Sequence, residues 1–272
     1  MPLQLQGANA LLTGGSQGLG PRFARALAER GVNLALAARS ADKLEAVAAG
    51  LRPLGVTVAF IAADLARAED RERLAAQAQA ALGPIDLLIN NAGVELNSRF
   101  ERKTAAEIDQ IITTNVIAPM QLTRLILPGM LARRRGHIVN LGSMAGRLGT
   151  PFGSVYGSSK ATLIAWSWAL RVELQGTGVG VSVINPGLVS ETGLFAYHRI
   201  PPHFLLGQVT PEAVVKALVR AITHDVPVVD VYPWLFKSYE LLNLFSPAAV
   251  MYLQDRLGVR RWLKRVYDKE QP

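Results

Sequence analysis

The chain has 272 residues, no cysteine, and 29 Lys and Arg against 21 Asp and Glu, which gives a formal net charge of +8. Half of its residues are hydrophobic and 18% are charged, which excludes an intrinsically disordered protein. The lack of cysteine excludes disulfides, thiolate metal sites and a cysteine nucleophile, and it favours a reducing compartment. The segment 1–7 lacks the profile of a signal peptide, and no apolar run is long enough to span a bilayer. We therefore expect a cytoplasmic protein.

Apolar segments alternate with amphipathic segments along most of the chain. The continuous apolar runs predict buried strands at Ala8–Thr13, Asn33–Ala38, Val56–Ala62, Ile85–Asn90, His137–Leu141, Val179–Asn185 and Val226–Val231. Helices are predicted at Gly18–Arg30, Ala41–Arg52, Glu69–Leu82, Ala105–Arg133 and Val155–Gln175, and from Pro211 onward. This alternation predicts an α/β fold with a doubly wound parallel sheet. We expect a single domain over residues 1–232, followed by a helical extension at 233–272.

A glycine-rich segment, Thr13–Gly20, joins the first strand to the first helix. Gly14 allows a tight turn, Gly18 lets the backbone approach a phosphate, and Gly20 lets the helix pack against the sheet. The helix N-terminus offers free N–H groups to an anion, so the segment predicts a dinucleotide-binding loop. The Gly14-x-Ser16-x-Gly18 spacing also fits the nucleophile elbow of serine hydrolases. An elbow on the first strand, however, leaves no earlier loop to supply an oxyanion hole.

The end of the second strand indicates which dinucleotide is bound. An acidic residue there would accept hydrogen bonds from a ribose 2′-hydroxyl and repel a 2′-phosphate. This chain has Arg39 and Ser40 instead, which can hold that phosphate. The pair favours NADP, with NAD as the alternative.

Three polar residues near the fifth strand suggest acid–base chemistry. Ser143 follows that strand, and Tyr156 and Lys160 are one helical turn apart on the next helix. An unperturbed Tyr, with a pKa near 10, exchanges protons poorly at neutral pH. A neighbouring ammonium lowers the pKa of the phenol, so Lys160 is expected to make Tyr156 a usable acid or base.

Together these motifs resemble those of the short-chain dehydrogenase/reductase family, in its shorter common form with an extended C-terminus. The matching residues are Thr13, Gly14, Gly18, Gly20, Asp64, Asn90, Asn91, Ala92, Gly93, Asn115, Ser143, Tyr156, Lys160, Pro186 and Gly187. The resemblance implies a Rossmann-type fold and hydride transfer between NADP(H) and a carbonyl or hydroxyl group.

The same resemblance implies a role for each catalytic residue. Ser143 would bind the substrate oxygen, and Tyr156 would be the general acid or base. Lys160 would lower the pKa of Tyr156 and bind the nicotinamide ribose, and Asn115 would hold a water that links Lys160 to solvent. The implied cofactor-binding residues are Gly14, Ser16, Gln17, Gly18, Leu19, Gly20, Arg39, Ser40, Asp64, Leu65, Asn91, Ala92, Gly93, Tyr156, Lys160, Pro186, Gly187 and Val189. No metal site is expected.

The chain departs from the family pattern at two cofactor positions. Glu191 stands where the family usually has a Thr that meets the nicotinamide carboxamide, with Ser190 and Thr192 on either side. The carboxamide contact therefore stays open, apart from the backbone of Val189. Gln17 stands where many NADP-dependent members have Lys or Arg.

The C-terminal part predicts the substrate class and the partners. The apolar segment Leu194–Leu206, which includes His198 and His203, lies where the family has its substrate lid, and it favours a hydrophobic carbonyl or alcohol. In 256–266, Val259, Leu263 and their apolar neighbours Trp262 and Val266 fall at helical spacing beside five cations. This helix would either lie on an anionic membrane or pack on its own domain.

Three further expectations complete the sequence-based picture. The charge pattern shows no nucleic-acid module, so no nucleic-acid partner is expected. Pairing of the helices at 105–133 and 155–175, as in the family, implies a homodimer. The alternative to an enzyme is a catalytically inactive dinucleotide-binding regulator or membrane-surface scaffold.

Overall fold

The computed structural model describes residues 2–191, 203 and 206–267. Its central sheet is parallel throughout, in the order β3-β2-β1-β4-β5-β6-β7. The strands are β1 (Asn9–Thr13), β2 (Asn33–Ala38), β3 (Val58–Ala62), β4 (Leu87–Asn90), β5 (Gly136–Leu141), β6 (Val179–Pro186) and β7 (Val228–Val231). The predicted doubly wound parallel fold is confirmed. The strand order reverses between β1 and β4, which is where such sheets bind ligands.

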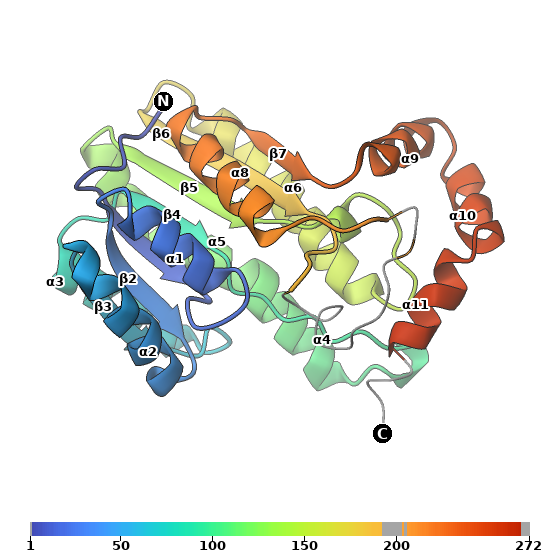
Figure 1. Ribbon diagram of the computed structural model, residues 1–272, viewed down its shortest axis with the longest axis horizontal. Coiled ribbons are helices and arrows are strands. Elements are labelled where there is room, and N and C mark those ends of the chain that lie inside the picture. The colour runs from blue at the N-terminus through green and yellow to red at the C-terminus, as the bar shows by residue number, and fades with distance from the viewer. Residues whose placement is uncertain (1, 192–202, 204–205, 268–272) are drawn as a thin grey trace.

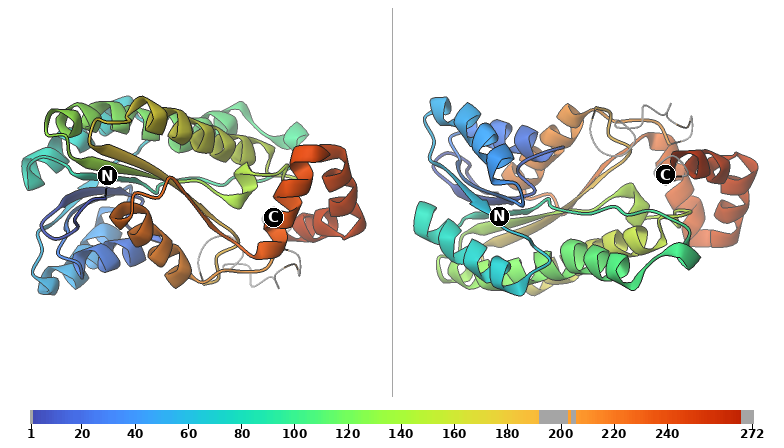
Figure 2. Two further views of the ribbon diagram at one scale, coloured as in Figure 1. Left: turned by 90° about the horizontal axis from the view of Figure 1, so that it is seen from above. Right: turned by 90° about the horizontal axis from the view of Figure 1, so that it is seen from below.

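Helices cover both faces of the sheet (Figure 1; Figure 2). Three pack with the core on one face, namely α1 (Gly20–Ala28), α2 (Ala41–Leu51) and α8 (Pro211–Thr223). Three pack with the core on the other face, namely α3 (Ala68–Leu82), α5 (Ala118–Ala132) and α6 (Ser154–Glu173). Successive strand residues alternate between the two cores, so Leu12 joins the first and Leu11 the second. The strands are therefore apolar on both sides.

The long helix predicted at Ala105–Arg133 is interrupted. It consists of α4 (Ala105–Ile112) and α5, joined by a π-helical turn at Thr113–Ile117. The prediction of one regular helix is wrong at this turn, because the apolar pattern indicates a helix on both sides of it and does not mark where a residue is inserted. π-Helical turns of this kind often lie at functional sites, and this one contains the buried Asn115.

In the described residues, three helices follow β7 and form one end of the molecule (Figure 1). They are α9 (Trp234–Phe245), α10 (Pro247–Arg256) and α11 (Val259–Tyr267). Val259 and Leu263 of α11 are buried against residues that include Phe152 and Tyr239, so this apolar side packs on its own chain. The side chain of Val266 lies outside the described residues. No helix in the described part of the chain is long and apolar enough to cross a membrane.

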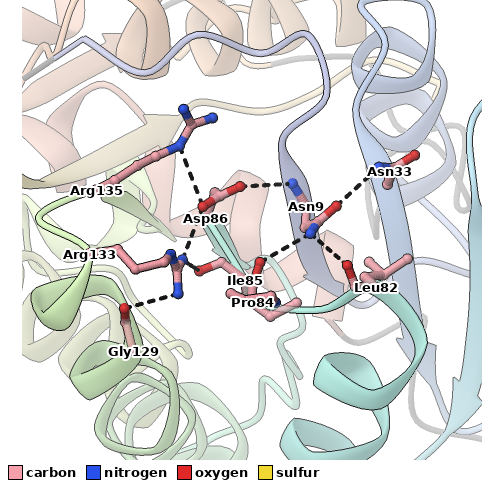
Figure 3. Close-up of polar contacts among 9 residues, drawn as sticks. All are labelled: Asn9, Asn33, Leu82, Pro84, Ile85, Asp86, Gly129, Arg133 and Arg135. Atoms are coloured by element: carbon pink, nitrogen blue, oxygen red, sulfur yellow. Dashed lines mark hydrogen bonds and ion pairs between the residues drawn. The ribbon is translucent and has the colours of Figure 1, made fainter.

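A polar cluster ties the amino ends of the strands together (Figure 3). Asn9 donates from Nδ2 to the carbonyls of Leu82, at 2.6 Å, and Pro84, at 3.1 Å. Asp86 accepts the backbone N–H of Asn9 at 3.3 Å and forms an ion pair with Arg133 at 3.0 Å. The cluster holds the amino ends of β1 and β4 and the end of α5 together, on the side of the sheet opposite the carboxyl ends of the strands.

Candidate active site

A cavity of about 640 Å³ lies at the carboxyl ends of the strands, across the point where the strand order reverses. Three of the four expected catalytic residues line it, namely Ser143, Tyr156 and Lys160. The expected cofactor-binding residues that line it are Gly14, Ser16, Gln17, Gly18, Leu19, Arg39, Ser40, Asp64, Leu65, Asn91, Ala92, Gly93, Tyr156, Lys160, Pro186, Gly187 and Val189. Gly20 and Asn115 do not line the cavity, but each contacts a residue that does, Gly14 and Val94 respectively.

The glycine-rich loop is built for close backbone approach. A Cβ on Gly14 would lie 2.7 Å from Asn91 Nδ2, and a Cβ on Gly20 would lie 2.0 Å from the Gly14 carbonyl oxygen. Gly18 has a positive φ of 63° and no protein atom within 4 Å of a built Cβ, so the space before its backbone is open. Asn91 also donates from Nδ2 to the carbonyls of Thr13 and Gly14. The loop and the segment after β4 thus form one wall.

A pair of cations also lines the cavity. Arg39 and Ser40 line the cavity after β2, as expected, and Lys43 joins them from the first turn of α2. Sequence reasoning missed Lys43, although its position three residues after Ser40 places it on the same turn of the helix. Two cations and a hydroxyl suit a phosphate group.

β5 and α6 bring Ser143, Tyr156 and Lys160 together. Ser143 directly caps a short 3₁₀ helix, Met144–Gly146, and its Oγ accepts the N–H of Ala145 at 3.1 Å. Lys160 donates from Nζ to the carbonyl of Leu141 at 2.7 Å, and this Nζ lies 5.8 Å from the centre of the Tyr156 ring. The end of β5 therefore holds the lysine beside the phenol.

The ionisation of this group differs from the expectation based on sequence. Burial, followed by the negative charge of Glu95, raises the pKa of Tyr156 above its usual value, and a hydrogen bond with Ser143 only partly offsets this. Burial lowers the pKa of Lys160 to about 8, against the opposing effect of Glu95. The expected lowering of the Tyr156 pKa is thus not seen, because burial disfavours the charged forms of both groups.

Glu95 is a cavity residue that sequence reasoning missed. It lies two residues after Gly93, lines the cavity and affects both Tyr156 and Lys160 electrostatically. Its Oε1 accepts a hydrogen bond from Asn97 Nδ2 at 2.5 Å. The sequence signal that could have identified Glu95 is a carboxylate directly after the Asn-Asn-Ala-Gly-Val segment.

Asn115 supports the site from behind. Its Oδ1 accepts the backbone N–H of Val94 at 2.8 Å, and its Nδ2 donates to the Val94 carbonyl and to Ser159 Oγ, both at 3.0 Å. A Cβ on Gly93 would lie 3.3 Å from Asn115 Oδ1 and 3.4 Å from Lys160 Nζ. The π-helical turn thus joins the segment after β4 to the first turns of α6.

The C-terminal helices close an apolar end of the cavity. Its lining there includes Leu148, Leu206, Phe236, Val259 and Leu263. Most of the expected lid, including Leu194–Tyr197, His198 and Phe204-Leu205, lies outside the described residues, as does Thr192.

The sequence matches the family model for short chain dehydrogenase over residues 8–203. The chain belongs to the short-chain dehydrogenase family. It is 44% identical over 220 residues to the ketoacyl reductase HetN of Nostoc sp. (strain PCC 7120), covering 81% of this chain and 77% of that protein. No single residue decides this membership, since the match extends over most of the chain.

Solved structures of other short-chain dehydrogenases have the same fold. A metagenomic short-chain oxidoreductase in complex with NADP matches with a TM-score of 0.72 and 32% identity, over 84% of this chain and 97% of that one. A short-chain dehydrogenase from Sphingobium yanoikuyae in complex with NADPH matches with a TM-score of 0.75 and 31% identity, over 82% and 87%.

Glu191 marks the departure of this short-chain dehydrogenase from the family pattern. Its backbone has a φ of 62°, and its carboxylate forms an ion pair with Arg22 of α1 at 2.9 Å. It does not line the cavity, whereas Leu188 and Val189 do. The Glu191 carboxylate is therefore held by α1, outside the cavity lining.

Proposed function

We propose that this protein transfers a hydride between NADP(H) and the carbonyl or hydroxyl carbon of an apolar small molecule. The observation that carries the proposal is that one cavity joins the glycine-rich loop to Ser143, Tyr156 and Lys160. A binding protein needs the loop alone, whereas hydride transfer also needs a proton donor beside the substrate oxygen. This set argues against the catalytically inactive regulator.

The residues present fit a nicotinamide dinucleotide. The open space before Gly18 and the start of α1 would accept a pyrophosphate, and Asp64 and Leu65, which line the same cavity, would contact the adenine. Arg39, Ser40 and Lys43 would hold a 2′-phosphate, which favours NADP over NAD; the NADP and NADPH complexes of two relatives support this. When bound, the cofactor supplies or accepts the hydride at its nicotinamide ring.

The protein's own groups handle the proton. Because burial and Glu95 raise the pKa of Tyr156, its hydroxyl is protonated at neutral pH and can donate to a carbonyl oxygen as the carbon gains the hydride. Ser143 would hold that oxygen, and Lys160 would bind the nicotinamide ribose. Asn115 keeps the wall behind them in place. Alcohol oxidation uses the same groups, with the Tyr156 phenolate as base.

The apolar end of the cavity indicates the substrate class. Phe236, Val259 and Leu263 can bury a hydrocarbon chain, which favours a ketone with a long apolar substituent. The name of the relative from Nostoc, a ketoacyl reductase, points to 3-oxoacyl compounds within this class.

We assign separate roles to the two parts of the chain. Residues 1–232 would bind the dinucleotide and perform the chemistry, and residues 233–272 would complete the apolar end of the cavity.

A homodimer through α5 and α6 is supported by Trp168 and Val172, which are 44% and 64% exposed on α6. A sedimentation experiment that finds only monomers would contradict the dimer. Location in the cytoplasm stays a prediction.

The test is a titration of the purified protein with NADPH and NADH, followed by nicotinamide fluorescence, with 3-oxoacyl thioesters and simple ketones then added. Selective NADPH binding with loss of NADPH absorbance on addition of an apolar ketone would support the proposal. NADPH binding without turnover of any ketone or alcohol would favour the inactive regulator. Binding of neither dinucleotide would contradict both.

A further inference from the structure

The outer side of α9 carries four large apolar side chains although the inner side is already packed. On the inner side, Phe236 is only 5% exposed and packs edge-to-face on Tyr232, with the two ring centres 4.9 Å apart. On the outer side, together with the exposed Lys237 and Ser238, lie four exposed apolar side chains, Trp234 at 76%, Leu241 at 58%, Leu244 at 79% and Phe245 at 81%. Their spacing of 7, 10 and 11 residues from Trp234 places them on one helical face. We call these four residues the outer α9 face.

A helix with large apolar side chains on both its buried and its exposed side is unusual at a protein surface. A soluble helix normally buries one apolar stripe and turns a polar face to water. Large apolar side chains gathered on an exposed face indicate a surface that is covered by something else. α10 adds the exposed Tyr252 to the same C-terminal end.

The C-terminal helices also carry an excess of exposed positive charge. Lys237 is exposed on α9, and Arg256, Arg260, Arg261, Lys264 and Arg265 are exposed on α10 and α11. Residues 233–267 hold these six cations and only two acids. One of the acids, Glu240, is turned inward: it accepts the Tyr232 hydroxyl at 2.6 Å and pairs with Arg147 at 3.3 Å. The exposed charge of α9–α11 is therefore strongly positive.

The combination favours an anionic lipid surface over other occupants. A second copy of this chain docked on the same face would bring the two sets of cations together, which is repulsive. An anionic bilayer accepts the apolar side chains in its interface and attracts each cation. The apolar side of α11 does not take part, because Val259 and Leu263 are already buried.

We infer that the outer α9 face and the exposed cations of α10 and α11 dock on an anionic lipid bilayer. The inner sides of the same helices line the cavity through Phe236, Gln254 and Leu263. An apolar substrate dissolved in the membrane would then be separated from the cavity by a single layer of helices. Binding to the bilayer does not depend on the proposed function; only this supply of substrate rests on it.

The test is flotation of the full-length protein with phosphatidylcholine vesicles made with and without phosphatidylglycerol. The expected result is flotation with the phosphatidylglycerol vesicles, weakened by high salt because salt screens the cations. The double variant Leu244→Ser/Phe245→Ser should reduce the bound fraction about tenfold or more, since both side chains lose their apolar contact with lipid. Leu54→Ser changes an exposed leucine outside α9–α11 and should leave flotation unchanged.

A second set of variants separates the charge contribution. Arg261→Gln/Lys264→Gln/Arg265→Gln should remove the preference for phosphatidylglycerol vesicles. The inference is overturned if the wild-type protein does not float, or if the Leu244/Phe245 variant floats as the Leu54 variant does. It is also overturned if size-exclusion chromatography shows that the wild-type protein is a dimer and the Leu244/Phe245 variant is a monomer, because the outer α9 face would then join two copies. Flotation without ketone reduction would uphold the bilayer contact and count only against the proposed function.

Discussion

Asn115 and Val94 form a reciprocal pair of hydrogen bonds, in which the asparagine side chain both accepts the valine N–H at 2.8 Å and donates to its carbonyl at 3.0 Å. The pair joins the π-helical turn to the segment that follows β4. Because Gly93 and Glu95 flank Val94, the pair also fixes the cavity wall next to Lys160.

Replacing Asn115 with Ala should therefore destabilise the protein. The change leaves the partly buried N–H and carbonyl of Val94 and the buried Ser159 Oγ without their Asn115 partner, and it should lower the free energy of unfolding by about 3 kcal/mol. Urea denaturation measures this. Asn243→Ala, at a half-buried position on α9, is the control. Equal unfolding midpoints for the two variants would contradict a structural role for Asn115.

Removing the two cations near Ser40 should change the cofactor preference. The double variant Arg39→Ala/Lys43→Ala should weaken NADPH binding about 10- to 100-fold while changing NADH binding little, since only NADPH carries the 2′-phosphate. Arg52→Ala removes an exposed arginine that pairs with Glu45 instead, and it serves as the control. An unchanged ratio of the two dissociation constants would show that Arg39 and Lys43 do not read the phosphate.

The charge of Glu95 should appear in the pH dependence of activity. Because this charge raises the pKa of Tyr156, Glu95→Gln should lower that pKa and move the rise of alcohol oxidation with pH to lower values. The amide can keep the hydrogen bond with Asn97. Glu101→Gln, at an exposed position, should leave the profile in place. If both variants give the wild-type profile, Glu95 does not act on Tyr156.

His137 should make the fold sensitive to acid. Burial lowers the pKa of His137 to about 4, below the ordinary value of 6.5, so the unfolded chain takes up the proton first as the pH falls. The stability is complete above about pH 6.5 and falls by about 3 kcal/mol as the pH decreases to about 4.

The structure also indicates which ring nitrogen carries the proton. Ser182 Oγ donates to the Val226 carbonyl at 2.7 Å, so the contact at 2.8 Å between this Oγ and His137 Nε2 requires a proton on Nε2. His137→Gln can keep that donor and should flatten the loss of stability between pH 6.5 and 4 in urea titrations. His224→Gln, at an exposed position, should not. A wild-type slope in the His137 variant would contradict this account.

The sequence was sufficient for the sheet and for most of the cavity wall. Strands such as Leu34–Ala38 are apolar on both faces because helices cover both, and this pattern is visible without coordinates. The π-helical turn was not predicted, because the apolar pattern indicates a helix on both sides of Asn115 and does not mark where a residue is inserted. The raised pKa of Tyr156 depends on burial and on Glu95, which spacing along the chain does not reveal.

The C-terminal helices show the same limit. The apolar spacing of Val259 and Leu263 predicted an amphipathic helix but did not decide between a membrane and the protein's own domain. The structure buries both side chains, while the exposed apolar residues lie on α9. Which side of a helix is buried depends on its tertiary partners, and the spacing of apolar residues does not identify those partners.

The most direct test of the central claim is the activity of Tyr156→Phe with NADPH and an apolar 3-oxoacyl compound, beside the exposed control Tyr252→Phe. Loss of the phenolic proton should lower kcat/KM by about 10²- to 10⁴-fold, because general acid catalysis contributes about that much, while the dissociation constant for NADPH changes little. Tyr252→Phe should keep the wild-type rate. Wild-type turnover by Tyr156→Phe would contradict the proposed mechanism.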